Sequence, residues 1–201
     1  MSARRSLLLS TRNAHKVREF NRLLGADGSV TVEPLPEEVT LPPEDGDTFA
    51  DNALPKARAA AAATGRIAIA DDSGIEAAAL DGRPGVRSAR YAGPEATDEE
   101  NLAKLMAEAP AGSALRYVCA LAYVDPASAT ERVFFGYCTG RLAEVARGSR
   151  GFGYDPAFLP DGDYDGRTMA ELTDSEKDAI SHRARAVAAM LAWLPEAPTG
   201  G

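Results

Sequence analysis

Apolar and polar positions in the first part of the chain switch repeatedly between a strand-like and a helix-like period. Residues 6–10 form a short apolar run, and residues 14–24 then repeat apolar side chains at helical spacing. A second strand is expected at residues 31–35, followed by a Pro-rich acidic connector at residues 36–47. The alanine-rich residues 48–64 predict a second helix, which gives a strand–helix–strand–helix order.

Two residues of the second predicted helix bear on where it begins and ends. Gly65 fits a C-terminal cap, because glycine adopts the left-handed conformation that commonly closes a helix. Pro55 lacks a backbone N–H and clashes with the preceding turn, so it either kinks the helix or marks a later start.

The rest of the chain adds further strands and two more helical regions. Residues 67–70 predict a compact buried strand that ends before Asp71, and residues 75–80 predict another. The remaining expected elements are a loop at 84–97, a helix at 98–109, strands at 115–124 and 130–139, a glycine-rich aromatic loop at 148–155, a capping box at 173–176 and a helix at 181–194.

This order of elements indicates an α/β protein with a mixed sheet. Alternating strands and helices favour parallel pairing, whereas the two long strands joined by a short turn favour an antiparallel hairpin. No internal repeat or low-complexity block is present. We expect a single domain over residues 1–196 and a frayed tail at 197–201.

Composition and charge restrict the partners of this domain. The 201 residues are 45% hydrophobic and 26% charged, with a net charge of −8, which is ordinary for a globular protein but repels nucleic acid. The three-leucine run near the amino terminus is too short for a signal peptide or a membrane helix, so a cytoplasmic protein is expected. Cys119 and Cys138 fit buried, reduced thiols.

The loop between the first strand and the first helix is the first candidate for chemistry. It contains Thr11, Asn13 and Lys16, at a helix amino terminus whose free N–H groups and partial positive charge suit phosphate. The same residues also fit simple N-capping by Asn13 beside a solvated lysine. Alone, this segment does not decide between the two, since it is not a Walker loop.

Acidic residues form the second candidate. Glu44 lies in the connector, and Asp71 and Asp72 follow a predicted buried strand, where ligands of α/β sheets commonly bind. Mg²⁺ prefers oxygen ligands and typically uses one or two carboxylates plus substrate phosphates, so Glu44 and Asp72 fit such a site, with one carboxylate also taking a proton from water. Alternatively, Asp71 or Asp72 caps a turn completed by Ser73 and Gly74.

The third and fourth candidates lie in the second half of the chain. Glycines on both sides of Phe152 leave its ring open to a flat partner such as a base, and Asp155 can accept hydrogen bonds. Lys177 suits an anion, while His182 and Arg183 can donate to a carbonyl oxygen. The alternatives are aromatic residues that fill a small core and a histidine with a structural hydrogen bond.

Six segments together closely resemble the non-canonical purine NTP pyrophosphatase family, also called inosine triphosphate pyrophosphatases or XTP/dITP diphosphatases. They occur in the same order over nearly the whole chain. The matching segments are Thr11-x-Asn13-x-x-Lys16, Asp47-Thr48-Phe49-x-Asp51-Asn52-Ala53-x-x-Lys56-Ala57, Ala70-Asp71-Asp72-Ser73-Gly74, Pro84-Gly85-Val86-x-Ser88-Ala89-Arg90-Tyr91, Gly151-Phe152-Gly153-Tyr154-Asp155-Pro156 and Glu171-Leu172-x-x-x-Glu176-Lys177-x-x-Ile180-Ser181-His182-Arg183.

The resemblance implies an elongated two-lobed mixed α/β fold with the nucleotide between lobes, a homodimer, and Mg²⁺-dependent release of pyrophosphate from ITP, dITP and XTP. It implies that Asp72 is general base and metal ligand and that Glu44 is the other metal ligand. The triphosphate would be held by Thr11, Arg12, Asn13, Ala14, His15, Lys16 and Ser73. The base and sugar would be held by Phe152, Gly153, Tyr154, Asp155, Lys177, His182 and Arg183.

The chain departs from the family pattern at three positions. Arg12 and His15 replace glycines found in many relatives, which makes the phosphate loop bulkier and more cationic, and Pro43 stands where an acidic residue is frequent. Two other functions remain open: a Maf-type nucleotide pyrophosphatase with other base preferences, and a non-catalytic nucleotide sensor. The Ser-His-Arg segment opposes the first, and the carboxylates Glu44 and Asp72 oppose the second.

Overall fold

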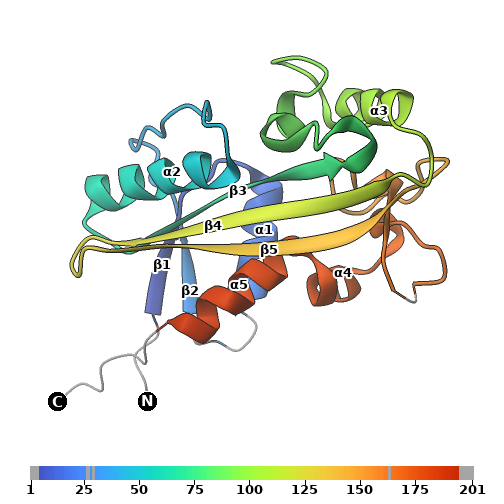
Figure 1. Ribbon diagram of the computed structural model, residues 1–201. Helices are drawn as coiled ribbons and strands as arrows, with labels where there is room; N and C mark the ends of the chain where they lie inside the picture. The colour runs from blue at the N-terminus through green and yellow to red at the C-terminus, as the bar shows by residue number, and fades with distance from the viewer. Residues whose placement is uncertain (1–4, 26–27, 29, 163, 195–201) are drawn as a thin grey trace. The chain divides into compact units, whose positions relative to one another are not determined.

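Six strands form one mixed sheet in the order β2-β1-β3-β4-β5-β6 (Figure 1). The computed structural model of the protein describes residues 5–25, 28, 30–162 and 164–194. β1 pairs in parallel with β2 and β3, whereas β5 pairs antiparallel with β6, so the predicted mixed α/β fold is confirmed. The strands are β1 Arg5–Leu9, β2 Val30–Pro34, β3 Ala68–Ala77, β4 Ala114–Asp125, β5 Thr130–Leu142 and β6 Phe158–Pro160.

Helices connect and flank these strands (Figure 1). They are α1 Ala14–Gly25, α2 Phe49–Thr64, α3 Asp98–Glu108, α4 Asp174–Ile180 and α5 His182–Trp193, with short 3-10 helices at Ala78–Leu80, Gly85–Arg90, Asp155–Ala157 and Met169–Glu171. No helix in the described part of the chain has the length and apolar character needed to cross a membrane.

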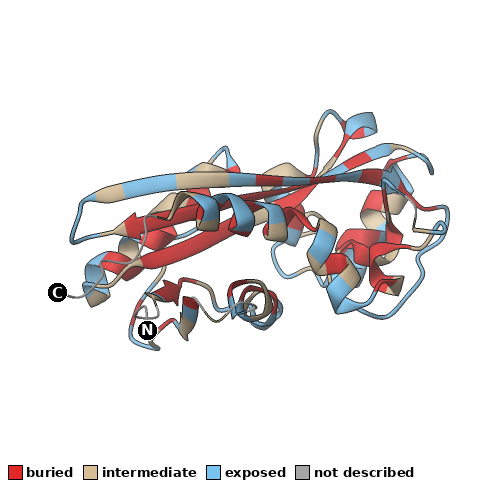
Figure 2. Ribbon diagram, turned by 90° about the horizontal axis from the view of Figure 1, so that it is seen from below, coloured by how far each residue is buried: buried red, intermediate tan, exposed pale blue. Residues whose placement is uncertain are grey.

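The chain folds into two compact units. Unit 1 comprises Met1–Asp72, Ala120–Gly136 and Arg183–Gly201, and unit 2 comprises Ser73–Cys119 and Tyr137–His182. Each unit has its own buried side chains, and buried residues are concentrated in the strands (Figure 2). The prediction of a single domain over residues 1–196 stays a prediction, and the predicted tail at 197–201 lies outside the described residues.

In unit 1, small side chains let α2 approach the sheet. Ala53, Ala57 and Ala60 are fully buried on one face of the helix, because residues three and four apart share a helix face. The Thr48 side chain accepts from the backbone N–H of Asp51, and Gly65 closes the helix at φ 66°. Pro55 lies inside α2, so the alternative of a later helix start is wrong.

Unit 2 has a core in which strand and helix residues pack around aromatic rings. Its largest members include Leu105 from α3, Tyr117 from β4 and Phe158 from β6. Cys119 and Cys138 are buried and are not joined in a disulfide, as predicted. Tyr154, one of the residues that the sequence assigned to base recognition, belongs to this core.

The structure corrects three expectations about local structure. β3 is one strand from Ala68 to Ala77, so Asp71 and Asp72 lie within it rather than after its end, and residues 78–80 form a 3-10 turn. Gly74 lies within this strand, and glycine is needed there because a Cβ would come within 2.4 Å of Ser88 Oγ. The predicted loop at 84–97 contains a 3-10 helix, and strand β6 was not predicted.

Candidate active site

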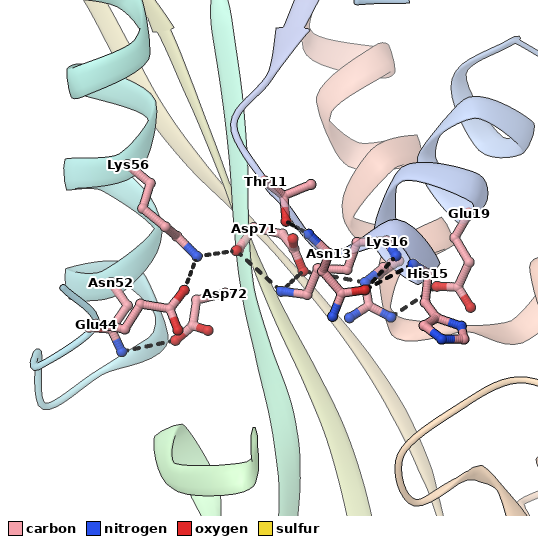
Figure 3. A network of polar contacts seen from close by, with 11 residues as sticks. Thr11, Asn13, His15, Lys16, Glu19, Glu44, Asn52, Lys56, Asp71 and Asp72 are labelled. Atoms are coloured by element: carbon pink, nitrogen blue, oxygen red, sulfur yellow. Dashed lines mark hydrogen bonds and ion pairs between the residues drawn. The ribbon is translucent and has the colours of Figure 1, made fainter. Parts of the chain in front are cut away.

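The loop from Thr11 to Lys16 joins β1 to α1 in unit 1 (Figure 3). Asn13 Oδ1 accepts hydrogen bonds from the backbone N–H groups of His15, at 2.9 Å, and Lys16, at 3.2 Å. The N-capping that the sequence left open is therefore present. Capping uses the Asn13 oxygen and leaves Lys16 in the first helical turn, where its ammonium group extends toward β3 (Figure 3).

The Arg12 side chain is bound to the connector that follows β2. Its Nη1 donates to Leu35 O at 2.9 Å, and its Nη2 donates to the carbonyl oxygens of Pro36, Glu37 and Val39 at 2.6, 3.1 and 3.1 Å. Because the guanidinium is committed to the connector, the prediction that Arg12 contacts phosphate rests on its backbone N–H alone.

Asp71 is a fully buried carboxylate that forms ion pairs with cationic side chains from segments distant in the sequence. Its Oδ2 lies 3.0 Å from Lys16 Nζ and 3.3 Å from Arg183 Nε. Burial raises the pKa of Asp71, but the charges of Lys16, Arg183 and Lys56 outweigh burial and hold that pKa below its ordinary value. Asp71 is thus an anion that positions the cations Lys16 and Arg183.

Successive residues of a strand point to opposite sides, so Asp72 faces a different set of groups from Asp71. Asn52 Nδ2 donates to Asp72 Oδ2 at 2.9 Å, and Asn52 Oδ1 accepts from the backbone N–H of Gly46 at 2.8 Å. One α2 side chain therefore links the carboxylate of Asp72 to the acidic connector that carries Glu44 (Figure 3).

Lys56 connects Glu44 to β3. Its ammonium group forms an ion pair with Glu44 Oε1 and donates to Asp71 O at 2.7 Å. Lys56 is only 5% exposed, so water screens the interaction between its charge and the neighbouring groups only weakly.

The environment of Asp72 suits a proton acceptor. Burial raises the pKa of Asp72, Lys16 and Lys56 oppose the rise, and the charge of Glu44 adds to it, with a net pKa above the ordinary range. A raised pKa makes a carboxylate a stronger base, which is the property that general-base catalysis uses.

Asn52 and Lys56 were quoted in the sequence pattern but given no role. A signal for both was available, because residues four apart on a helix lie on the same face. Thr48 caps α2, so Asn52 and Lys56 fall in its first two turns and turn toward β3.

The described residues contain no group of three or more His, Cys, Asp or Glu side chains that could hold a metal ion. Glu44 and Asp72 offer two carboxylates, which is the number that Mg²⁺ commonly takes from protein when phosphate oxygens and water complete its shell. The donor set therefore fits Mg²⁺ bound together with a phosphorylated ligand.

Arg183 lies in unit 1, in contrast to the other residues predicted to hold the base. Besides Asp71, its guanidinium contacts Glu19, with Nη1 2.9 Å from Glu19 Oε2, and both side chains are less than one-tenth exposed. Buried ion pairs of this kind restrict the two side chains to one geometry. The assignment of Arg183 to the base stays a prediction.

The predicted base-binding loop lies in unit 2 around a buried carboxylate. Asp155 is 3% exposed and accepts from Lys177 Nζ at 2.6 Å and from Phe152 N at 3.0 Å. Gly151 is required beside it, because its φ is 71° and a Cβ there would come within 2.0 Å of Asp155 Oδ2. Lys177 Nζ also lies 5.2 Å from the centre of the Phe152 ring.

Tyr154 and His182 are held by the interior of unit 2. Tyr154 donates its hydroxyl to Ser88 O at 2.7 Å, and burial raises its pKa. Its side chain therefore fills the core, which was the alternative the sequence left open. His182 is 3% exposed and stacks on Tyr117, with ring centres 4.7 Å apart and planes 9° apart. Sequence reasoning gave no role to Tyr117.

Together the mixed sheet and the cluster of carboxylates and lysines define an α/β protein equipped to handle a phosphorylated ligand. The chain belongs to the Ham1 family, whose model matches residues 7–193.

Similar proteins agree with this assignment over nearly the whole chain. A dITP/XTP pyrophosphatase of Symbiobacterium thermophilum is 50% identical over 201 residues, covering 97% of each chain. One of Cutibacterium acnes is 46% identical over 192 residues, covering 92% of this chain and 94% of its own. The structure of a HAM1 protein from Coxiella burnetii superposes with a TM-score of 0.81 at 38% identity, covering 92% of this chain and 96% of that one.

Proposed function

We propose that this protein hydrolyses non-standard purine nucleoside triphosphates, namely dITP, ITP and XTP, to the monophosphate and pyrophosphate, and so cleanses the nucleotide pool. The observation that carries the proposal is the pair Glu44 and Asp72, set among Lys16, Lys56 and Asn52 in unit 1. Relatives that are about half identical over the full length bear the name dITP/XTP pyrophosphatase.

Asp72 is the proposed general base. It takes a proton from a water molecule, whose oxygen forms a bond to the α-phosphorus while the bond from that phosphorus to the bridging oxygen of pyrophosphate breaks. The hydrogen bond from Asn52 fixes the orientation of the carboxylate that takes the proton.

Most of the groups assigned to the phosphates are cations and N–H groups of unit 1, whereas Ser73 belongs to unit 2. Lys16 and the loop from Thr11 would bind the triphosphate at the amino terminus of α1, and Ser73 would add a hydroxyl group. Lys56 would place Glu44 next to the departing pyrophosphate. Glu44 and Asp72 would hold a divalent metal, for which we propose Mg²⁺, and the bound ion would neutralise charge on the phosphoryl oxygens.

The purine is assigned to residues of unit 2, except for Arg183, which belongs to unit 1. The Phe152 ring would stack on the base, and Lys177 and His182, with Arg183, would supply donors for a 6-oxo group. Adenine carries a 6-amino group, which would leave those donors unpaired, and unpaired buried donors weaken binding strongly.

A release assay tests the proposal against both alternatives. With Mg²⁺, dITP is expected to yield dIMP and pyrophosphate far faster than dATP yields dAMP. Orthophosphate as the first product would contradict a pyrophosphatase, and equal rates on the two substrates would contradict recognition of the 6-oxo group. A nucleotide sensor would bind dITP without turnover, and a Maf-type enzyme would prefer other bases.

We also propose that the protein forms a homodimer and that it acts in the cytoplasm. Phe135 and Tyr137 are 45% and 40% exposed on β5. Side chains two apart in a strand lie on the same side, so these two aromatic rings offer apolar area for contact with a second copy. Light scattering of the protein, and of a Phe135→Ser and Tyr137→Ser double variant, checks this: the wild type is expected at twice the monomer mass and the variant at the monomer mass.

A further inference from the structure

Tyr117 links two parts of the proposed base site in unit 2. It lies on β4, is 6% exposed, and packs in the core of that unit. An apolar side chain would be enough to fill this buried position on the strand, so packing alone does not require the hydroxyl group of Tyr117. A tyrosine there must find a hydrogen-bond partner, and it finds one in the base-binding loop.

The hydroxyl group of Tyr117 donates to Asp155 Oδ1 at 3.0 Å. The other oxygen of Asp155, Oδ2, accepts from Lys177 Nζ and from the backbone N–H of Phe152. Three protein donors thus hold one buried carboxylate, and Tyr117 is the donor that fixes Oδ1. A carboxylate held at both oxygens cannot rotate, so the Phe152 loop and the Lys177 ammonium keep one geometry.

The ring of Tyr117 holds a second base-site residue. It lies nearly parallel to the imidazole of His182, with centres 4.7 Å apart and planes 9° apart, and it also contacts Phe158, with centres 4.6 Å apart and a tilt of 39°. A stacked neighbour restricts the plane of the imidazole, and with it the directions in which the ring N–H groups can donate.

We propose that Tyr117 is a positioning residue for purine recognition. Its hydroxyl orients Asp155 and, through it, Phe152 and Lys177, while its ring orients His182. Tyr117 touches no reacting atom in this scheme and acts only through residues that meet the base. The inference rests on the proposed assignment of the purine to unit 2. The ligand that Tyr117 would help this site to recognise is a 6-oxopurine nucleotide.

Binding of dIMP, measured by calorimetry, tests the role without depending on turnover. Tyr117→Phe keeps the ring and removes the hydroxyl, and is expected to weaken dIMP binding about tenfold, which is the usual scale for losing a hydrogen bond to a charged group. Pyrophosphate binding in the presence of Mg²⁺ is expected to stay within about twofold, because the charged groups proposed to hold it, Lys16, Glu44 and Asp72, lie in unit 1. A purely structural role would lower both affinities or neither.

Tyr123→Phe is the matched control. Tyr123 lies six residues further along β4, is 4% exposed, and contacts Trp193 at its edge, with ring centres 5.2 Å apart. The same chemical change there removes a buried tyrosine hydroxyl in unit 1, and is expected to leave dIMP binding unchanged. An equal loss in both variants would overturn the proposal.

A second variant separates the hydroxyl from the ring. Tyr117→Leu removes the stack on His182 as well as the hydroxyl, and is expected to weaken dIMP binding several-fold more than Tyr117→Phe does. Equal losses would overturn the role of the ring. A double-variant cycle of Tyr117→Phe with Asp155→Asn is expected to be strongly non-additive, since the hydroxyl acts through that carboxylate; additive losses would overturn the role of the hydroxyl.

Phe152→Ala distinguishes failure of this inference from failure of the base-site assignment. If Phe152→Ala weakens dIMP binding and Tyr117→Phe does not, the role of Tyr117 alone is wrong. If neither variant weakens dIMP binding, the purine does not bind at this site, and both the assignment and the inference are wrong.

Discussion

The two candidate regions of this molecule use opposite means to arrange polar groups. In unit 1, charge is balanced by charge: Asp71 faces Lys16 and Arg183, and Lys56 faces Glu44. In unit 2, one carboxylate, Asp155, is fixed by three donors, and one of these donors, Tyr117, stacks its ring on His182. The first region is a set of ion pairs, and the second is a single carboxylate held by hydrogen bonds.

The difference fits the two tasks of a selective pyrophosphatase. Electrostatic stabilisation of a phosphoryl transition state depends on cations and carboxylates near the reacting atoms, whatever base the nucleotide carries. Discrimination between bases depends on donors held in one place, because only then does a mismatched group leave a donor unpaired. Changes in unit 1 should therefore lower turnover of all triphosphates equally, and changes in unit 2 should alter the ratio between dITP and dATP.

The largest expected effect follows from Asp72→Asn. The amide keeps the shape and removes the base, so kcat for dITP should fall by about 10²–10⁴-fold, the usual contribution of general-base catalysis. The rate with dATP should fall by the same factor, leaving the ratio unchanged. Steady-state kinetics with both substrates measure this, with the exposed Asp45→Asn as control. Turnover that persists in Asp72→Asn would remove Asp72 from the role of base.

Lys56→Met should act through Glu44. The substitution keeps the apolar stem and removes the ammonium that pairs with Glu44 and donates to Asp71 O. We expect kcat to fall about 10- to 100-fold, as for loss of one electrostatic contact in an active site, and the Mg²⁺ concentration for half-maximal rate to rise. A metal titration at saturating dITP measures both. An unchanged metal requirement would show that Lys56 does not position Glu44.

Phe152→Ala should produce the opposite pattern. Loss of base stacking costs about 1–3 kcal/mol, so KM for dITP should rise about 5- to 150-fold while kcat changes little. The preference for dITP over dATP should also shrink, since both bases lose the same stack but only dITP uses the donors aligned by it. An equal fall in kcat for both substrates, with no change in the preference for dITP over dATP, would contradict the assignment of catalysis to unit 1 and base recognition to unit 2.

Charged candidates were easier to find in the sequence than Tyr117, for a physical reason. Charged residues such as Lys16, Glu44 and Asp72 are seldom buried without a partner or a function, so each one was visible as a candidate by its type alone. Tyr117 gave no such signal. A tyrosine in an apolar strand is ordinary core, and its partners Asp155 and His182 lie 38 and 65 positions away in the chain.

β3 shows how a local pattern fails at a functional position. Asp71-Asp72-Ser73-Gly74 reads as a turn because these residue types favour turns, yet the strand continues through it. The charge of Asp71 is compensated by Lys16 and Arg183, from α1 and α5, and Gly74 is needed against Ser88. Such long-range contacts override local preference, and a single sequence does not reveal them.

The smallest expected effect follows from a change at Arg12, whose guanidinium we do not count among the phosphate-binding groups of unit 1. Its planar fork donates to four carbonyl oxygens of the connector, a geometry that a lysine cannot reproduce. Arg12→Lys should lower the free energy of unfolding by about 0.5–1 kcal/mol, since these hydrogen bonds are partly exposed. Because the guanidinium binds the connector rather than the phosphates, kcat should change less than about twofold and the ratio of the rates on dITP and dATP should not change.

Denaturant unfolding measures the change in stability and steady-state kinetics measure the change in turnover, with Arg18→Lys on the exposed side of α1 as control. A loss of turnover comparable to that of Lys56→Met, at unchanged stability, would instead return the Arg12 guanidinium to the phosphate site that the sequence alone assigned to it.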